Sequence, residues 1–216
     1  MQGRFTPYFV QSKVTGGHFA FKTEKGTKPF ENPMDTCIKI KLVPTDIVAD
    51  VGAYVGEYSL YAARQGVHKV LSYEPTPQSF ALLNKNKKPN MEIFNCAVVG
   101  TDAPAVTLYI SKGIGVTNSI AKNRNKQSAI SVKAIKYERA IQDATVVKID
   151  VEGAEYGYNI IQPNLRAIIL EFHPIVGKDW QQRAHEIMDS IESAGFTRIV
   201  RPHFKSGWSL IGCWEK

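Results

Sequence analysis

The feature that most constrains the fold is an apolar strand that runs into a glycine turn and then into a helix. The strand covers Ile47–Val51, and Gly52 follows it directly. Helical spacing then covers Glu57–Gln65, and a second apolar strand covers Val67–Tyr73. Two strands joined by a helix pair in parallel, so this succession predicts an α/β fold with a parallel sheet.

The alternation of strands and helices continues along the chain. We predict further helices at Pro77–Lys87, Tyr137–Ile141, Ala154–Ile161 and Gln181–Ala194, and further strands at Met91–Val99, Thr145–Val151, Arg166–Phe172, Thr197–Arg201 and Trp208–Trp214. Val106–Ser111 and Ala129–Ile135 alternate in polarity like an inserted antiparallel hairpin. Residues 1–43 read as turns and short strands, with Cys37–Val43 the clearest strand. The sequence therefore predicts a lead-in or cap over 1–43 and one main domain over 44–216.

The glycine turn has the composition of a nucleoside-cofactor site. Gly52 allows a tight turn, the small Ala53 lets a ligand approach the backbone, and Gly56 allows close packing at the helix start. Glu74 follows about twenty residues later, where an acid accepts hydrogen bonds from ribose hydroxyls. The turn has the spacing G-x-x-x-G and follows Asp50, whereas dinucleotide sites use G-x-G-x-x-G. We therefore favour S-adenosylmethionine, which carries an ammonium and a sulfonium, over a nicotinamide cofactor.

Three later strand ends add candidate side chains. The third strand ends in Asn95, Cys96 and Ala97, where a backbone N–H could contact the adenine base. The carboxylates of Asp150, Glu152 and Glu155 follow the strand at Thr145–Val151, and Glu171 and His173 close the next strand. Ligands of such sheets bind outside the carboxyl ends of the strands. A plainer interpretation makes Glu155 a partner of a helix dipole and His173 an ordinary residue at a strand end.

Four motifs together resemble the FkbM family of S-adenosylmethionine-dependent methyltransferases. They are Asp50-Val-Gly-Ala-Tyr-Val-Gly56, Tyr73-Glu-Pro75, Asn95-Cys-Ala-Val98 and Lys148-Ile-Asp-Val-Glu-Gly-Ala-Glu155, followed by Leu170-Glu-Phe-His173. The resemblance implies a class I methyltransferase (Rossmann-like) doubly wound sheet of seven strands with the last strand antiparallel. It also implies that Asp50, Gly52, Glu74 and Asp150 line the cofactor site. Tyr54 departs from the asparagine that the family often has there.

The resulting prediction separates cofactor-binding from catalytic residues. The cofactor-binding set is Asp50, Gly52, Ala53, Tyr54, Gly56, Glu57, Glu74, Pro75, Asn95, Cys96, Ala97 and Asp150. The catalytic set is Asp150, Glu171 and His173, with His173 a candidate base because histidine titrates near neutrality. Asp150, Glu152, Glu171 and His173 also form an oxygen-rich set of the kind that suits magnesium. The sequence does not say whether they converge, and no metal is predicted.

Family members commonly methylate hydroxyls of sugars and natural products, so the leading hypothesis is a small-molecule or glycan O-methyltransferase. The net charge of +7 is concentrated between Ser111 and Arg139, which favours a nucleic-acid acceptor or is simply a solvated hairpin. A third hypothesis is a protein that binds the cofactor without catalysis. We expect no membrane span, and the polar start and three distant cysteines favour a cytoplasmic location.

Overall fold

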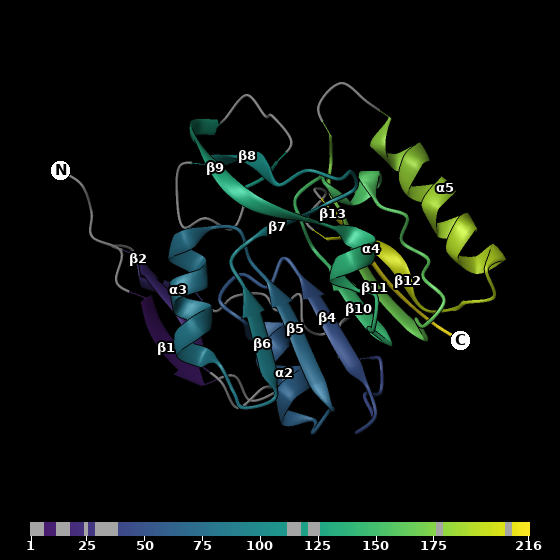
Figure 1. Cartoon of the computed structure of the whole chain (residues 1–216), viewed down its shortest axis with the longest axis horizontal. Helices are drawn as coiled ribbons and strands as arrows, with labels where there is room; N and C mark the ends of the chain where they lie inside the picture. Colours follow the sequence, from purple (N-terminus) through teal and green to yellow (C-terminus); the bar gives the residue numbers. More distant parts are fainter. Residues whose placement is uncertain are drawn as a thin grey trace.

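A mixed sheet forms the centre of the molecule. The computed structural model describes residues 7–11, 18–23, 26–28, 39–111, 118–120, 126–175, 179–205 and 209–216. Among these residues, seven strands pair in the order β12-β13-β11-β10-β4-β5-β6 (Figure 1). Their bounds are β4 Ile47–Val51, β5 Lys69–Tyr73, β6 Met91–Phe94, β10 Val146–Ile149, β11 Ala167–Phe172, β12 Thr197–Lys205 and β13 Ser209–Glu215. Five neighbouring strands of the sheet, β11, β10, β4, β5 and β6, are parallel to one another. Strand β13 is antiparallel to both of its neighbours, β11 and β12, which confirms the predicted class of fold.

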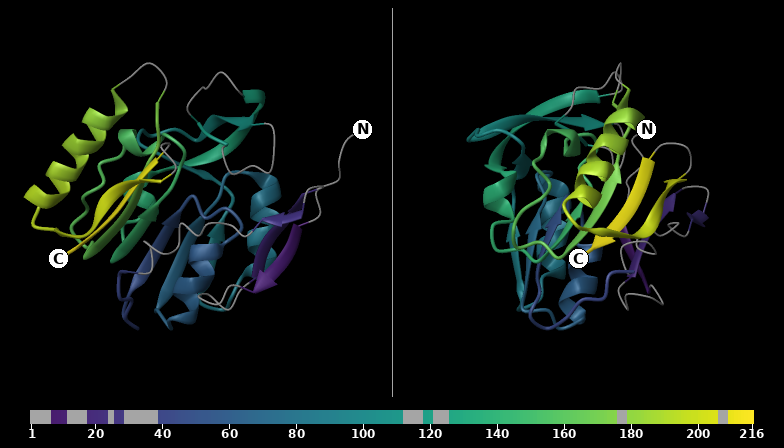
Figure 2. Two further views of the ribbon diagram at one scale, coloured as in Figure 1. Left: turned by 180° about the vertical axis from the view of Figure 1, so that it is seen from behind. Right: turned by 90° about the vertical axis from the view of Figure 1, so that its right-hand side faces the viewer.

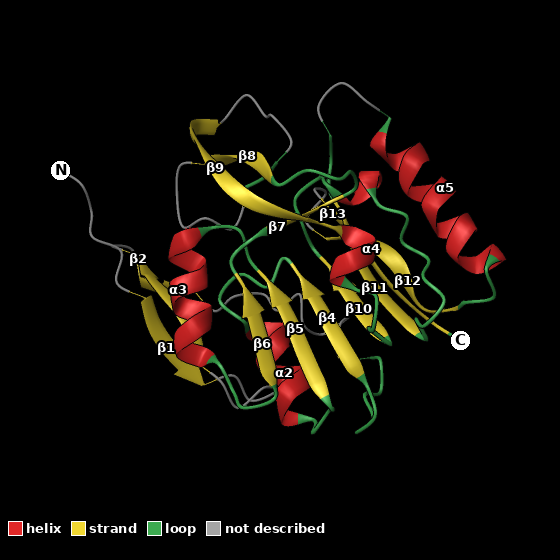
Figure 3. Ribbon diagram, in the orientation of Figure 1, coloured by secondary structure: helices red, strands yellow, loops and turns green. Residues whose placement is uncertain are grey.

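Helices cover both faces of this sheet (Figure 3). Helices α2 (Glu57–Arg64) and α3 (Pro77–Asn86) share one buried cluster with Val48, while α5 (Trp180–Ser193) shares a second with Ala49. The short helix α4 (Tyr137–Ala140) belongs to the second cluster. Neighbouring residues of β4 thus point to opposite layers, as the twofold repeat of a strand requires. Both faces are buried, which explains the nearly continuous apolar runs in the sequence.

A second, small sheet lies above the carboxyl ends of the parallel strands (Figure 1). It contains β7 (Ala97–Val99), β9 (Lys126–Lys136) and β8 (Ala105–Ser111), in that order. The pairing of β8 with β9 is antiparallel and confirms the inserted hairpin. The single strand predicted at Met91–Val99 is wrong, because the chain divides it between β6 and β7. The break falls at Asn95, whose amide nitrogen donates to the backbone oxygens of Glu74 and Pro75.

Two other predicted elements differ from the structure. The helix predicted at Ala154–Ile161 is only a 3-10 turn, η1, at Glu155–Gly157. Tertiary hydrogen bonds override the local pattern there, since the Tyr158 hydroxyl donates to the Val98 oxygen. The predicted strand at Cys37–Val43 lies partly outside the described residues, and its described part is a turn and loop. The Val43 N–H donates to the Asp46 carboxylate, which keeps this backbone out of a ladder.

The amino-terminal segment contains three short strands that form an antiparallel sheet of their own. They are β1 (Pro7–Gln11), β2 (His18–Thr23) and β3 (Gly26–Lys28). This sheet lies at the opposite end of the molecule from α5 (Figures 1 and 2). The division into a cap and a main domain stays a prediction. No helix in the described part of the chain combines the length and the apolar character needed to cross a membrane.

Candidate active site

A cavity of about 240 Å³ opens at the carboxyl ends of β4, β5, β10 and β11. Ten of the predicted site residues line it: Gly52, Ala53, Tyr54, Glu57, Glu74, Pro75, Ala97, Asp150, Glu171 and His173. Asp50, Gly56, Asn95 and Cys96 are not among the lining residues. The fold thus brings most of the predicted set together from four strand ends that lie far apart in the sequence.

The turn after β4 is held tightly against the neighbouring strands. The N–H groups of Gly52 and Ala53 both donate to the backbone carbonyl oxygen of Tyr73, at 3.0 and 2.9 Å. Gly52 has a φ of +84°, and a Cβ there would lie 1.8 Å from the Asp150 carbonyl oxygen. Only glycine fits this position, since any side chain would collide with backbone. The next left-handed residue is Tyr54 at a φ of +52°, a conformation that asparagine adopts more readily than tyrosine.

Glu74 lies at the end of β5, with 6% of its surface exposed. Its two carboxylate oxygens accept the backbone N–H groups of Tyr54 at 2.9 Å and Thr76 at 2.7 Å. Burial raises the pKa of Glu74 to about 7, and these hydrogen bonds limit the rise. The carboxylate therefore connects the glycine turn to the β5 end and can still accept hydrogen bonds from a ligand in the cavity.

Asp50 lies beneath the cavity rather than in its wall. It is fully buried, its carboxylate accepts the Ser59 hydroxyl at 2.6 Å, and it faces Lys148 across the β4–β10 pairing. The Lys148 ammonium donates to the Gly52 oxygen at 2.9 Å and lies 3.3 Å from Asp50 and 3.4 Å from Asp150. The Lys148 ammonium thus holds both the glycine turn, through Gly52, and the catalytic candidate Asp150.

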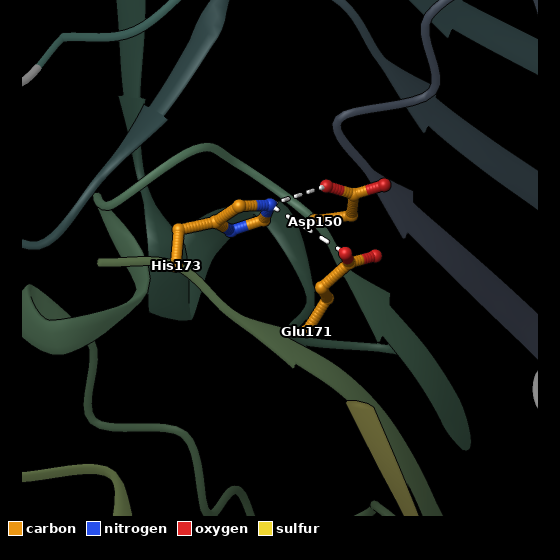
Figure 4. Close-up of side chains that lie close together, drawn as sticks. All are labelled: Asp150, Glu171 and His173. Atoms are coloured by element: carbon orange, nitrogen blue, oxygen red, sulfur yellow. Dashed lines mark ion pairs between the residues drawn. The ribbon is translucent and has the colours of Figure 1, made fainter. Parts of the chain in front are cut away.

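His173 is the centre of an acidic cluster (Figure 4). Its Nε2 atom lies 3.6 Å from Asp150 Oδ1 and 3.7 Å from Glu171 Oε1, and also 3.6 Å from Glu152 Oε1. Asp150 directly follows β10, and Glu171 and His173 lie two residues apart at the end of β11, so both point to the same side of the sheet. The parallel pairing of Ile149 with Leu170 brings the two strand ends into register.

The surroundings of His173 change its protonation state. Burial lowers the pKa of the imidazole, but the negative charges of Glu155 and the other surrounding carboxylates outweigh burial and raise the pKa to about 10. The unliganded side chain is therefore positively charged at neutral pH. The expectation that His173 titrates near neutrality is wrong, because the sequence does not show how many carboxylates surround the ring.

Glu155 is a buried structural partner of this histidine rather than a surface charge at a helix start. Its carboxylate is fully buried and accepts the backbone N–H groups of Gly153 at 2.8 Å and His173 at 2.6 Å. The same oxygen that accepts the His173 N–H lies 3.5 Å from the ring atom Nδ1. Glu155 therefore fixes both the backbone and the orientation of the ring.

The remaining predicted residues support the cavity from outside. Asn95 fixes the loop that follows Glu74 through the hydrogen bonds described above, and Gly56 has a φ of +92° at the start of α2. Burial raises the pKa of the Cys96 thiol to about 11. Their contribution to cofactor binding stays a prediction.

Sequence reasoning missed three contributors to the site. Lys148 had a visible signal, because a lysine in the middle of an otherwise apolar buried strand needs buried partners. Asn118 and Ser119, between β8 and β9, also line the cavity. The Ser119 hydroxyl donates to the backbone carbonyl oxygen of Glu152 at 2.6 Å, and the Asn118 side-chain amide donates to the Thr76 hydroxyl at 3.2 Å. No local pattern marks these two residues, because their role depends on where the insert lies.

The strand order, the glycine turn after β4 and the acidic end of β5 define a Rossmann-like methyltransferase. The family model described as "Methyltransferase FkbM domain" matches residues 50–198. The chain therefore belongs to the FkbM methyltransferase family and is an S-adenosylmethionine-dependent methyltransferase. A methyl acceptor is implied by this activity. No curated protein sequence matches the chain.

Solved methyltransferase structures are similar to this chain at low sequence identity, and the one from Agrobacterium tumefaciens supports the fold. A SAM-dependent methyltransferase from Agrobacterium tumefaciens has a TM-score of 0.54 and 12% identity, with 100% of this chain and 71% of that chain covered. A precorrin-6Y C5,15-methyltransferase from Geobacter metallireducens has a TM-score of 0.49 and 13% identity, with 85% and 86% covered. At this identity the similarity concerns the fold and says nothing of the acceptor.

The residues around the cavity fit S-adenosylmethionine. Gly52 and Ala53 leave the turn without bulky side chains, and Glu74 supplies a buried carboxylate for hydroxyl groups. The apolar residues Pro75, Ala97 and Val98 suit a base, and Asp150 supplies negative charge for a sulfonium. The cavity therefore offers suitable residues for the ribose, the base and the sulfonium of this cofactor.

Proposed function

We propose that the protein methylates a hydroxyl group of a sugar or another small molecule. The observation that carries this proposal is the cluster of Asp150, Glu171 and His173, which borders the cavity on the side away from Glu74 along the sheet. A hydroxyl must lose its proton as it is methylated, and a carboxylate within reach can accept that proton. Nothing in this proposal depends on the basic residues of the insert.

The residues have separate tasks in this mechanism. S-adenosylmethionine, when bound, supplies a methyl group activated by a sulfonium. Glu74 and the glycine turn bind and orient the nucleoside part, and Asp150 is held by Lys148 between the cofactor region and the cluster. The imidazolium of His173 donates hydrogen bonds to the acceptor oxygen or to the carboxylates around it. Glu171, with 11% of its side chain exposed, and Asp150 are the candidates for the group that takes the acceptor proton.

The charge of the cavity argues against a nucleic-acid acceptor. The carboxylates of Asp150, Glu152 and Glu171 would repel a phosphodiester placed beside the cofactor. Of the basic stretch, Lys112, Lys122 and Arg124 lie outside the described residues. Arg139, which is described, forms an ion pair with Asp102 at 3.0 Å. A small neutral or polyhydroxylated acceptor fits the cavity better than an anionic polymer.

The test is a methyl-transfer screen with tritiated S-adenosylmethionine over sugars, glycosides, nucleotides, RNA, DNA and peptides. We expect label in a hydroxylated small molecule, in a product that resists alkali as an ether does and an ester does not. Glu171→Gln should reduce turnover by roughly 10²- to 10⁴-fold, the usual contribution of a general base. Glu92→Gln, an exposed acid on β6, is the matched control and should leave turnover unchanged.

Three outcomes would contradict the proposal. Transfer to RNA or DNA alone, with a steep dependence on salt, would assign a nucleic-acid acceptor. Cofactor binding without transfer to any acceptor would support a binding protein without catalysis. Turnover that is unchanged in both Asp150→Ala and His173→Ala would remove the catalytic assignment of the cluster.

A further inference from the structure

Three side chains at the ends of β10 and β11 converge as metal ligands do. One oxygen each of Asp150 and Glu171 and one nitrogen of His173 lie within 4.8 Å of one another. The two separations from His173 Nε2, 3.6 and 3.7 Å, exceed normal hydrogen-bond lengths. Adjacent ligand atoms around a cation with bonds of about 2.1 Å are about 3 Å apart, so a small closure of this cluster suffices to complete a site. Figure 4 shows the three side chains pointing toward one another from the two strands.

The second observation is the way the histidine is held. Only 9% of His173 is exposed, and its Nδ1 atom makes no hydrogen bond with the described residues but lies 3.5 Å from the Glu155 carboxylate. Histidines that bind metals through one nitrogen are usually oriented by a carboxylate at the other nitrogen. Glu155 is fully buried and already accepts the His173 backbone N–H, so it holds Nε2 toward Asp150 and Glu171.

The third observation is the balance of charge. Four carboxylates, those of Asp150, Glu152, Glu155 and Glu171, lie within 3.7 Å of one imidazole ring, and two of them are at least nine-tenths buried. Lys148 also lies beside this cluster, 3.4 Å from Asp150. Buried charges are normally paired or bound to a metal, and a divalent cation at Nε2 would lie among the carboxylates of Asp150, Glu152 and Glu171.

We propose that Asp150, Glu171 and His173 bind a divalent cation of the Mn²⁺ type at the acceptor side of the cavity. A mixed set of two carboxylates and one imidazole suits Mn²⁺ better than Mg²⁺, which prefers oxygen ligands and retains its waters. Glu152, whose Oε1 lies 3.6 Å from Nε2, is close enough to join through a water or directly. The remaining positions face the cavity, since all four residues line it.

The role of the cation rests on the proposed O-methylation. A hydroxyl bound to a divalent cation is more acidic than a free hydroxyl and is held in one orientation. The chain then holds the acceptor oxygen through the cation. With the cation bound, Asp150 and Glu171 are its ligands and no longer the candidates for the proton acceptor, as they are in the site without a cation. The proton passes to Glu152 or to water.

The test measures binding of MnCl₂ to the full chain by the loss of the free Mn²⁺ signal in electron paramagnetic resonance. We expect one Mn²⁺ per chain, with Mg²⁺ as a weak competitor. Glu171→Gln and His173→Gln should weaken Mn²⁺ binding by tenfold or more, and Glu155→Gln by about 10- to 100-fold through the orientation of the ring. Glu92→Gln should bind Mn²⁺ like the wild type. Binding of S-adenosylmethionine, measured by calorimetry, checks that each variant is folded. Because two ligand residues are changed separately, the test still works if one of the two variants does not fold.

The outcomes separate this proposal from the proposed function. Wild-type protein that binds S-adenosylmethionine but leaves the free Mn²⁺ signal unchanged overturns the cation site. Mn²⁺ binding that is equal in wild type, Glu171→Gln and His173→Gln places the ion elsewhere and also overturns it. Mn²⁺ binding that depends on these residues, in a protein that methylates no hydroxyl, keeps the site and overturns O-methylation.

Discussion

Replacing Glu74 with glutamine tests the cofactor end of the site. In the structure both carboxylate oxygens accept backbone N–H groups, from Tyr54 and Thr76. Glutamine has only one oxygen, so its NH₂ group must face one of these N–H donors. It also removes the negative charge that ribose hydroxyls would contact. The shape of the side chain is retained, so the change isolates the loss of acceptor capacity.

The size of the effect follows from hydrogen-bond energetics. A hydrogen bond to a charged group contributes about 1.5–3 kcal/mol, which corresponds to roughly 10- to 150-fold in affinity. We therefore expect Glu74→Gln to weaken S-adenosylmethionine binding by that factor in isothermal titration calorimetry. Glu92→Gln makes the same chemical change at an exposed position, paired with Lys69 at 2.8 Å, and should bind like the wild type.

The pH dependence sharpens this test. Since the pKa of Glu74 is raised to about 7, the carboxylate is lost as the pH falls below that value. Wild-type affinity for S-adenosylmethionine should therefore rise between pH 6 and pH 8, and Glu74→Gln should lack this rise. The reasoning is refuted if Glu74→Gln binds within about twofold of wild type or retains the full pH dependence.

Three further results concern stability. The pKa of Glu74 is raised from 4.5 to about 7 in the folded protein, so the protonated side chain stabilises the fold. This contribution is fully present below about pH 4.5 and is lost as the pH rises to about 7, a change of about 3 kcal/mol. Urea unfolding of the wild type and of Glu74→Gln across this pH range should show the difference. Gly52→Ala should prevent folding or lower the melting temperature sharply in calorimetry, because its Cβ would lie 1.8 Å from the Asp150 oxygen; a melting temperature like that of wild type would contradict this geometry. Asp46→Asn should cost about 1.5–3 kcal/mol in urea unfolding, because Asp46 is 1% exposed and its carboxylate accepts two hydrogen bonds from Arg166, at 2.8 and 2.6 Å; a loss below about 1 kcal/mol would contradict this pairing.

Local patterns were enough to predict most of the central sheet. Apolar strands alternating with helices fix a parallel order, and the glycine turn after Val51 with an acid at Glu74 indicates a nucleoside cofactor. The family motifs added the antiparallel last strand. These features are visible in the sequence because each depends on residues that are neighbours along the chain.

Patterns failed where distant backbone or side chains decide the local structure. Asn95 breaks the predicted strand at Met91–Val99, because its amide donates to the end of β5, about twenty residues earlier in the chain. The helix predicted at Ala154–Ile161 is reduced to one turn by tyrosine hydroxyls that bond to other elements, such as Tyr158 to Val98. In both places a tertiary hydrogen bond outweighs a local preference.

The sequence by itself determined the order of the elements, the glycine turn and the types of side chain at each strand end. Only the tertiary structure decided that Asp150, Glu171 and His173 meet at one point, and that Lys148 and Glu155 hold them there. The reason is that convergence depends on the register between β10 and β11, which is set by backbone hydrogen bonds between segments about twenty residues apart. The charge state of His173 follows from that register as well, since the ring follows β11 whereas the carboxylates of Glu155, Glu152 and Asp150, which raise its pKa, follow β10.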